Sequence, residues 1–226
     1  VTPVKGDGDK AEKRTVAGKP ASAAAPGKAG GLVDLLKTVF YAVLIAVVIR
    51  TFAFEPFNIP SGSMIPTLLV GDYLFVSKYP YGYSRYSLPF GLPLISGRIL
   101  GAEPERGDVV VFKLPSDNKT DYIKRIIGLP GDEIQLKGGI VHINGKPVER
   151  APVGSYTVPG GNGAGRSVQL YRETLPNGVS HAIIEMTDVG PYDNTGVYKV
   201  PPGHFFTMGD NRDSSRDSRF LGEVGY

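Results

Sequence analysis

The sequence predicts a mainly β protein, in which a single N-terminal transmembrane helix precedes an antiparallel β-sheet ectodomain with a smaller β subdomain. First, one apolar run lies near the N-terminus, with Arg50 as the only charge from Thr38 to Phe54. Second, short β-branched and aromatic segments alternate with turn residues beyond that run. Third, the 226 residues include 30 Gly and 19 Pro, which favour loop-rich β structure over a helical bundle.

The N-terminal part divides into a polar tail and an apolar helix. Residues 1–31 are rich in Lys, Ala, Gly and Pro and have almost no large apolar side chains, so we expect a disordered tail. Residues 32–54 suit a transmembrane anchor, with Arg50 reaching toward the headgroups. A buried core helix and a cleavable signal peptide are the alternatives, although "EPFNIP" offers no small-x-small cleavage site. The lysine-rich tail predicts a cytoplasmic N-terminus and an extracytoplasmic remainder.

Seven segments after the anchor are predicted to be strands, because β-branched and aromatic residues dominate them and Gly, Pro or Asp bound them. They are residues 72–78, 108–114, 121–128, 132–150, 167–175, 180–188 and 203–211. Gly138-Gly139 and Asn144-Gly145 predict turns, and the second pair suits a type I′ hairpin. No long amphipathic helix pattern occurs after residue 55.

Residues 78–100 differ from these strands, because they are rich in Tyr, Phe, Leu and Pro and poor in acidic residues. One interpretation is a loop packed on the β core. The other is an aromatic surface that enters the membrane interface, where tyrosine is favoured.

Composition excludes several classes of function. The net charge of +3 is too small to argue for nucleic-acid binding. The chain has no cysteine, which excludes disulfides and thiolate metal sites. The histidines at 142, 181 and 204 are too scattered to suggest zinc, and residues 209–219 lack the ligand pattern of a calcium loop. We therefore expect no metal and no cofactor. The chain begins with Val and stops at "FLGEVGY", so we expect both ends to be incomplete.

The stretch "PSGSMIPTLL" at residues 60–69 offers two candidate nucleophiles, Ser61 and Ser63. It is not the G-x-S-x-G elbow of α/β-hydrolases, and serines in such a loop are often plain turn residues. None of the three histidines stands in a loop beside a carboxylate partner, so a lysine is the other possible base.

A lysine can serve as a base only if burial keeps its amine neutral. Lys124 fits this requirement, because "DYIKRIIG" surrounds it with isoleucines. Strand alternation places Tyr122, Lys124 and Ile126 on one face and Arg125 on the other. We expect one of the two cations to face the interior. The alternative is that Lys124 is a solvated strand residue.

Taken together, four segments closely resemble bacterial type I signal peptidases, the membrane-bound Ser-Lys proteases of peptidase family S26 that remove signal peptides. They are "PSGSMIPTLLVGDYLFVSKYPYG" (60–82), "RGDVVVFKLP" (106–115), "DYIKRIIGLPGD" (121–132) and "MGDNRDSSRDSR" (208–219). They occur in the family's order after one predicted anchor.

The resemblance implies a role for particular residues. Ser63 would be the nucleophile and Lys124 the general base, while the Ser61 hydroxyl and the Ser63 N–H would form the oxyanion hole. Ser215 would orient Lys124 by a hydrogen bond. The remaining residues fall into two groups. Asp217 and Arg219 would form a supporting ion pair with Arg125 alongside, and the small substrate pockets would be lined by Phe57, Ile59, Pro60, Met64, Leu68, Tyr122 and Ile123.

The resemblance also implies an organisation and a substrate. Residues 55–132 and 201–226 would form the catalytic β domain, and residues 133–200 a smaller variable β subdomain. The enzyme would cleave secretory preproteins after small residues (Ala-x-Ala), at the outer face of the bacterial cytoplasmic (inner) membrane. We expect a monomer that contacts membrane lipid, needs no cofactor and binds no nucleic acid.

Two other functions remain open at this point. A membrane-tethered β-rich binding or assembly module without catalysis would also explain the anchor and the strands. A Ser-Lys self-cleaving regulator fused to a DNA-binding domain is disfavoured, because no helix-turn-helix precedes the candidate site.

Overall fold

The computed structural model describes residues 28–88, 94–159, 165–221 and 224–225. The chain forms two compact units, residues 1–45 and 46–226, and each is described by itself. Most of the tail predicted to be disordered, residues 1–27, lies outside the described residues.

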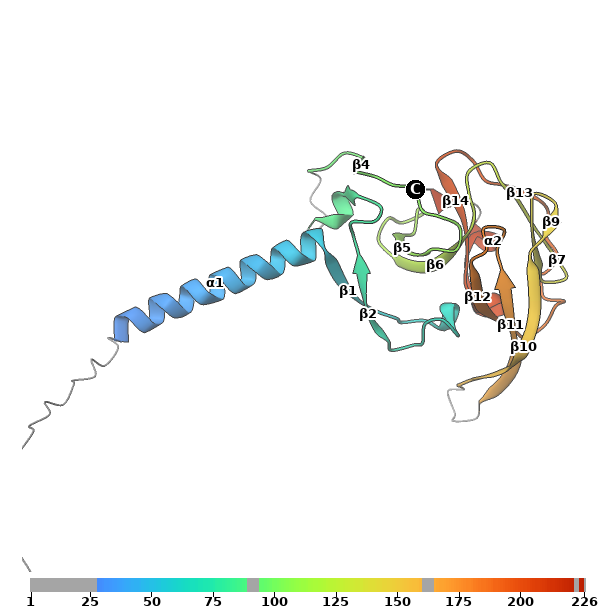
Figure 1. Ribbon diagram of the computed structural model, residues 1–226, viewed down its shortest axis with the longest axis horizontal. Coiled ribbons are helices and arrows are strands. Elements are labelled where there is room, and N and C mark those ends of the chain that lie inside the picture. The colour runs from blue at the N-terminus through green and yellow to red at the C-terminus, as the bar shows by residue number, and fades with distance from the viewer. Residues whose placement is uncertain (1–27, 89–93, 160–164, 222–223, 226) are drawn as a thin grey trace, which may run out of the picture. The chain divides into compact units, whose positions relative to one another are not determined.

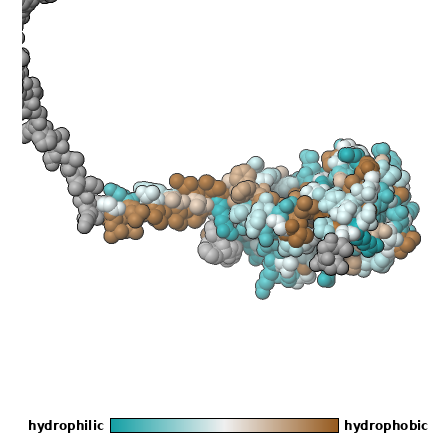
Figure 2. Space-filling model, turned by 90° about the horizontal axis from the view of Figure 1, so that it is seen from below, coloured by the Kyte–Doolittle hydropathy of each residue, from teal (hydrophilic) through white to brown (hydrophobic). Residues whose placement is uncertain are grey.

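The predicted anchor is a continuous helix, α1 (Lys28–Phe52). Its segment Gly31–Phe52 has a mean hydropathy of 2.3 and is long and apolar enough to cross a membrane. On the face that Figure 2 shows, apolar side chains occur along the length of this helix, and none of its most apolar 18-residue stretch is buried inside the protein. Such a helix needs an apolar environment from outside the chain. It ends at Phe52 rather than at the predicted residue 54, because a turn at Ala53 leads directly into a strand.

Residues 46–226 are mainly β, as predicted, and the strands pair antiparallel in several sheets (Figure 1). One four-stranded sheet has the order β15 (Val224–Gly225), β14 (His204–Met208), β6 (Asp121–Gly128) and β5 (Val109–Lys113). The other has the order β13 (Tyr198–Lys199), β7 (Glu133–Lys137), β8 (Ile140–Ile143) and β9 (Lys146–Pro147).

The remaining strands form one three-stranded sheet and two ribbons. The three-stranded sheet is β10 (Glu149–Val158), β11 (Arg166–Thr174) and β12 (Ser180–Glu185). The ribbons are β1 (Phe54–Asn58) with β2 (Tyr73–Ser77), and β3 (Tyr83–Ser84) with β4 (Arg98–Ile99). Short helices are η1 (Gly62–Met64), η2 (Arg85–Ser87), η4 (Arg212–Ser214) and α2 (Ser218–Leu221).

All seven predicted strand segments contain strands, and β6 has the predicted bounds. The predicted type I′ turn is also confirmed. Asn144 and Gly145 join β8 to β9 with φ values of 53° and 77°, the positive values that this turn requires. Strands β1, β3, β4, β13 and β15 and most of β10 were not predicted. Pro56 interrupts the pattern of β1, and pairing with β2 sets its conformation instead.

Two apolar clusters hold the segments around Ser63 and Lys124 in place. The larger one joins the two four-stranded sheets and comprises Ile127, Ile134, Leu136, Val141, Ile143, Val148, Leu175, Val200, Phe206 and Met208. The smaller one comprises Ile59, Met64 and Ile123, with Phe57, Leu68, Leu74 and Val111 packed against it. The smaller cluster therefore ties the segment around Ser63 to strand β6.

Candidate active site

The candidate nucleophile lies in a short, well-anchored turn. Ser63 is the middle residue of η1, and only 6% of it is exposed. The next residue, Met64, is fully buried against Ile59 and Ile123. Burying the methionine draws the preceding serine against β6, which explains why an otherwise polar turn is held in the interior.

The candidate base comes from strand β6 and meets this serine. Lys124 is 4% exposed, and its Nζ lies 2.7 Å from Ser63 Oγ. The same nitrogen donates to the Ile123 carbonyl oxygen at 2.8 Å, and it lies 5.2 Å from the centre of the Tyr122 ring. Two residues that are 61 positions apart in sequence are thus brought into hydrogen-bond contact.

The surroundings of Lys124 make its amine easier to deprotonate than that of an exposed lysine. Burial lowers the pKa of Lys124 from its usual 10.5 to about 8, although the negative charges of Asp217 and Asp210 partly oppose this shift. With that pKa, about one amine in ten is neutral at pH 7 and about half at pH 8. The Ser63 hydroxyl can then donate its proton to Nζ.

A candidate oxyanion hole adjoins the same two groups. Ser61 Oγ lies 3.4 Å from Ser63 Oγ, and the Ser61 side chain does not cap the short helix η1. The Ser63 N–H belongs to the first turn of η1, where backbone N–H groups have no acceptor within the helix. The Ser61 hydroxyl and the Ser63 N–H are therefore both available to donate hydrogen bonds to an oxyanion beside Ser63.

The other residues singled out from the 209–219 motif have mixed outcomes. Asp217 and Arg219 form the expected ion pair, with Nε to Oδ1 at 2.9 Å, and Asp217 also accepts from the Gly209 N–H at 3.0 Å. Ser215 differs from expectation, since its buried Oγ has no hydrogen-bond partner among the described residues. The hydroxyl lies against Gly209 instead, so closely that a Cβ added to the glycine would clash with it.

Arg125, which was expected alongside the Asp217–Arg219 pair, forms an ion pair of its own with Asp210. Its guanidinium holds both carboxylate oxygens of Asp210, with contacts of 2.9 and 2.7 Å, and it donates to the Gly107 carbonyl at 2.7 Å. Thr67 also donates to Asp210, at 2.5 Å. The expectation that only one of the two β6 cations faces the interior was wrong. Both Lys124 and Arg125 are buried, because this part of β6 is covered on both faces.

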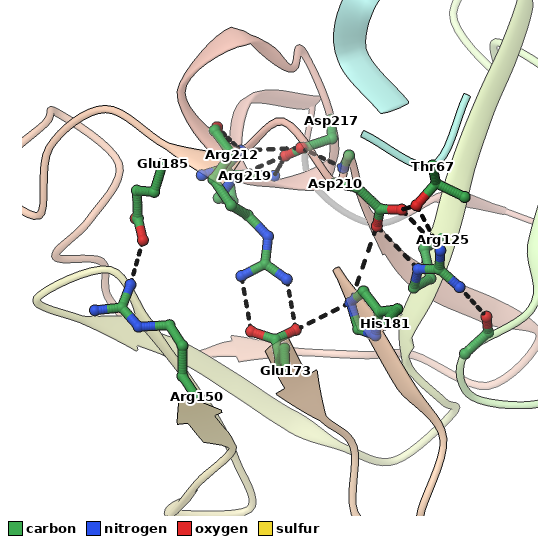
Figure 3. A network of polar contacts seen from close by, with 12 residues as sticks. Thr67, Arg125, Arg150, Glu173, His181, Glu185, Asp210, Arg212, Asp217 and Arg219 are labelled. Carbon is green, nitrogen blue, oxygen red and sulfur yellow. Dashed lines mark hydrogen bonds and ion pairs between the residues drawn. The ribbon is translucent and has the colours of Figure 1, made fainter. Parts of the chain in front are cut away.

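A second buried ion pair continues the network, as Figure 3 shows. The Arg212 guanidinium meets both oxygens of Glu173, with one contact of 2.9 Å, and both side chains are fully buried. His181 lies between the two pairs, 3.3 Å from Glu173 Oε1 and 3.9 Å from Asp210 Oδ1. Although burial opposes ionisation, Arg212 and His181 hold the pKa of Glu173 at about 2.

The predicted pocket residues are only partly gathered. Five of the seven lie in the smaller apolar cluster, whereas Pro60 is exposed and Tyr122 packs toward Lys124 instead. A cleft of about 770 Å³ is lined by residues of β1, β2, β5 and β6, including Phe57, Leu68 and Ile123. Neither Ser63 nor Lys124 lines it, so we do not assign the chemistry to this cleft.

Sequence reasoning missed several residues that hold the candidate site. They are Thr67, Gly209, Asp210 and Asn211, and all contact the segment around Ser63 or the residues that anchor it. The "GDN" part of the last motif was the signal that could have found three of them. Among the described residues, no group of three or more His, Asp or Glu side chains could hold a metal ion.

Comparison with known proteins gives one consistent result. A family model described as "Signal peptidase, peptidase S26" matches residues 32–225. Signal peptidase I of Rickettsia canadensis is 48% identical over 191 residues, which cover 81% of this chain and 71% of that protein. Signal peptidase I of Rickettsia typhi is 48% identical over 187 residues, which cover 79% of this chain and 69% of that protein.

A solved structure of a signal peptidase I from Enterococcus faecalis V583 is 26% identical, covers 55% of this chain and 91% of that chain, and gives a TM-score of 0.31. The family match and the two rickettsial relatives together show the family to which the chain belongs. This chain belongs to the peptidase S26 family of signal peptidases and is an enzyme of the serine hydrolase class.

Proposed function

We propose that this protein is a membrane-anchored serine endopeptidase that removes N-terminal signal peptides from secreted preproteins, with Ser63 and Lys124 as its catalytic dyad. The observation that carries the proposal is the 2.7 Å contact between a buried lysine amine and a buried serine hydroxyl. A solvated lysine on a strand would keep its usual pKa, and its amine would be hydrated by water instead of being held against a serine hydroxyl. The lowered pKa of Lys124 supports the same role.

The proposed reaction follows from this geometry. Neutral Lys124 takes the proton of Ser63 as Ser63 Oγ attacks the scissile carbonyl carbon. The Ser63 N–H and the Ser61 hydroxyl stabilise the tetrahedral oxyanion, and loss of one such donor typically costs about 3–4 kcal/mol. Protonated Lys124 then gives its proton to the leaving amine. The acyl-enzyme that remains is hydrolysed by water, which Lys124 activates in the same way.

Substrate would bind in an extended conformation along the edge formed by residues 57–60. In the described part of the chain, β1 pairs only with β2, so its other edge can accept a further strand. Ile59, Met64 and Ile123 pack together beside the segment that carries Ser63. A pocket walled by these side chains would accept small residues, in keeping with cleavage after Ala-x-Ala. Peptides with Ala replaced by Phe immediately before the cut should not be cleaved.

The apolar helix supports a location in the cytoplasmic membrane of a bacterium, with the N-terminus in the cytoplasm and the catalytic domain outside. Anchoring enzyme and preprotein in one bilayer raises the effective substrate concentration without new contacts. Residues 55–132 and 201–226 would form the catalytic domain, and residues 133–200 the smaller subdomain. The active enzyme would be a monomer.

Incubation of the detergent-solubilised protein with a secretory precursor tests the proposal. Wild type should release the signal peptide, while Ser63→Ala and Lys124→Ala should not. Exposed Ser180 on β12 supplies a matched control, and Ser180→Ala should cleave like wild type. Normal processing by both dyad variants would reject the mechanism and favour a non-catalytic binding module.

A further inference from the structure

We propose that Asn211 is a positioning residue that fixes the peptide group between Gly62 and Ser63 and thereby aims the Ser63 N–H at the oxyanion. This inference rests on the proposed function. Among the described residues, Asn211 donates hydrogen bonds to the Gly62 and Ser63 carbonyl oxygens and not to Lys124 or the Ser63 hydroxyl, so its role would be indirect.

Asn211 makes two hydrogen bonds to consecutive carbonyl groups of the nucleophile turn. Its side-chain Nδ2 donates to the Gly62 oxygen at 3.0 Å, and its backbone N–H donates to the Ser63 oxygen at 3.0 Å. Asn211 is only 5% exposed, so water does not easily replace these bonds. The two contacts clamp the turn from a segment that is 149 residues away in sequence.

Peptide geometry links the first of these bonds to the oxyanion donor. The peptide group is planar and this one is trans, so the Gly62 C=O and the Ser63 N–H point in opposite directions. Fixing the carbonyl oxygen therefore fixes the direction of the N–H. Glycine at position 62 leaves its backbone unusually free to rotate, which makes an external tether valuable. The Ile65 N–H also reaches the Gly62 oxygen, at 3.2 Å, but it moves with the same turn.

The support for Asn211 is itself rigid. The residue stands between Asp210 and Arg212, and each neighbour is held by a buried two-point ion pair, to Arg125 and to Glu173 respectively (Figure 3). In addition, the Ile184 N–H donates to the backbone carbonyl oxygen of Asp210 at 3.0 Å. A donor held from both sides can impose an orientation on a flexible turn, which is how supporting residues preorganise a site.

The test compares Asn211→Asp and Asn211→Ala with wild type in detergent. Asp keeps the shape and the backbone N–H, but it places an oxygen against the Gly62 oxygen. Asn177→Asp is the matched control, because Asn177 makes the same kind of amide-to-carbonyl bond, to Arg106 at 2.7 Å, on an exposed turn. For each protein we would measure kcat, KM, the pH profile, the thermal midpoint and inhibition by a peptide aldehyde.

We expect kcat to fall about 10- to 100-fold in both Asn211 variants, less than the loss of a whole oxyanion donor. KM should stay as in wild type in both variants. The apparent pKa of the pH profile should stay as in wild type in Asn211→Ala, whereas the carboxylate added in Asn211→Asp should raise it, as the neighbouring carboxylates Asp217 and Asp210 do. Affinity for the aldehyde should weaken in proportion to kcat/KM, because the aldehyde adduct carries an oxygen at the oxyanion position. The Asn177 variant should match wild type in all these measurements.

A folded Asn211→Ala variant with wild-type kcat, or one whose pH profile moves while kcat at its plateau stays as in wild type, would overturn the positioning role. If both variants fail to fold, the wild-type aldehyde complex decides. Its adduct oxygen should lie within hydrogen-bond distance of the Ser63 nitrogen while Asn211 still holds the Gly62 oxygen, and an oxygen bound elsewhere would overturn the inference. Retained activity in Ser63→Ala and Lys124→Ala would instead reject the dyad itself.

Discussion

Lys124 and Arg125 are neighbours on one strand, and both are buried, yet their surroundings differ completely. Lys124 Nζ contacts the Ser63 hydroxyl and the Ile123 carbonyl, and no carboxylate lies within ion-pair distance of it among the described residues. Arg125 holds both oxygens of Asp210 and donates to Gly107 as well. One cation is desolvated without a charged partner, and the other is desolvated with its charge compensated.

The difference matches the chemistry of the two side chains. A guanidinium stays charged in a protein, so burying it requires a carboxylate of fixed geometry. An amine can lose its proton instead, and burial without a partner favours that outcome. Strand β6 thus carries both the proposed proton acceptor, Lys124, and a structural ion pair, that of Arg125 with Asp210. Substitutions of Lys124 should therefore lower activity, whereas substitutions of Arg125 should lower stability.

The largest expected effect concerns the base. Lys124→Met keeps the length and the packing of the side chain but removes the proton acceptor, and Lys124→Arg keeps a cation that cannot become neutral. Both should lower kcat/KM about 10²- to 10⁴-fold, the usual contribution of a positioned general base. Cleavage of a precursor peptide measures this. Exposed Lys137 on β7 supplies the control Lys137→Met, and an active Lys124→Arg enzyme would contradict the role.

The next effect concerns the brace. Arg125→Met leaves Asp210 buried without its partner, which typically lowers the free energy of unfolding by about 3–5 kcal/mol. Urea unfolding of the solubilised protein measures it, with exposed Arg172→Met on β11 as the control. The double variant Arg125→Met with Asp210→Asn should recover part of the loss. A single variant within about 1 kcal/mol of wild type would show that the pair is not needed.

This contrast also marks the limit of what the sequence could predict. The apolar pattern of 121–128 made Lys124 a candidate base, and the resemblance of four segments to signal peptidases selected Ser63 and Lys124 from the candidates. Local pattern also predicted β6 and the Asn144-Gly145 turn. The partner of Arg125 could not be predicted in this way, because Asp210 lies 85 residues away and several carboxylates of the last motif were equally eligible.

The residues that support the candidate site show the same limit of prediction from sequence. Asn211 looks like one more polar residue in a charged loop, and its importance comes from two carbonyls that only the folded chain brings near. His181 falls within the predicted strand segment 180–188 and does lie on β12, but its place between Glu173 and Asp210 depends on how that strand packs. The hydrogen bond expected from Ser215 to Lys124 is absent among the described residues, because Ser215 lies against Gly209.

The third prediction is the pH dependence of cleavage. With the pKa of Lys124 lowered to about 8, and only the neutral form being active, kcat/KM should rise about tenfold per pH unit below pH 8 and level off above it. The carboxylate of Asp217 raises this pKa, so Asp217→Asn should move the profile to lower pH. A profile that is flat between pH 6 and 9 would contradict a lysine base.

The smallest effect is a gain in stability. Near neutral pH the buried Lys124 amine is mostly charged, so the folded state bears the unfavourable free energy of desolvating a cation. Lys124→Met removes that contribution and also the hydrogen bonds to Ile123 and Ser63, so we expect a net gain of about 1–2 kcal/mol in the free energy of unfolding at pH 7. Urea unfolding measures it, with Lys137→Met as the reference for a lysine that is exposed.

The pH dependence of this gain separates its cause from better packing. Between the folded pKa of about 8 and the unfolded value near 10.5, the unfolded wild-type chain binds more protons than the folded one. Wild-type stability should therefore rise with pH across that window, whereas the Met variant has no proton to lose at this position. The advantage of Lys124→Met should shrink as the pH increases from 8 toward 10. A constant advantage would mean that methionine merely packs better, and that desolvation of the Lys124 amine does not destabilise the folded state.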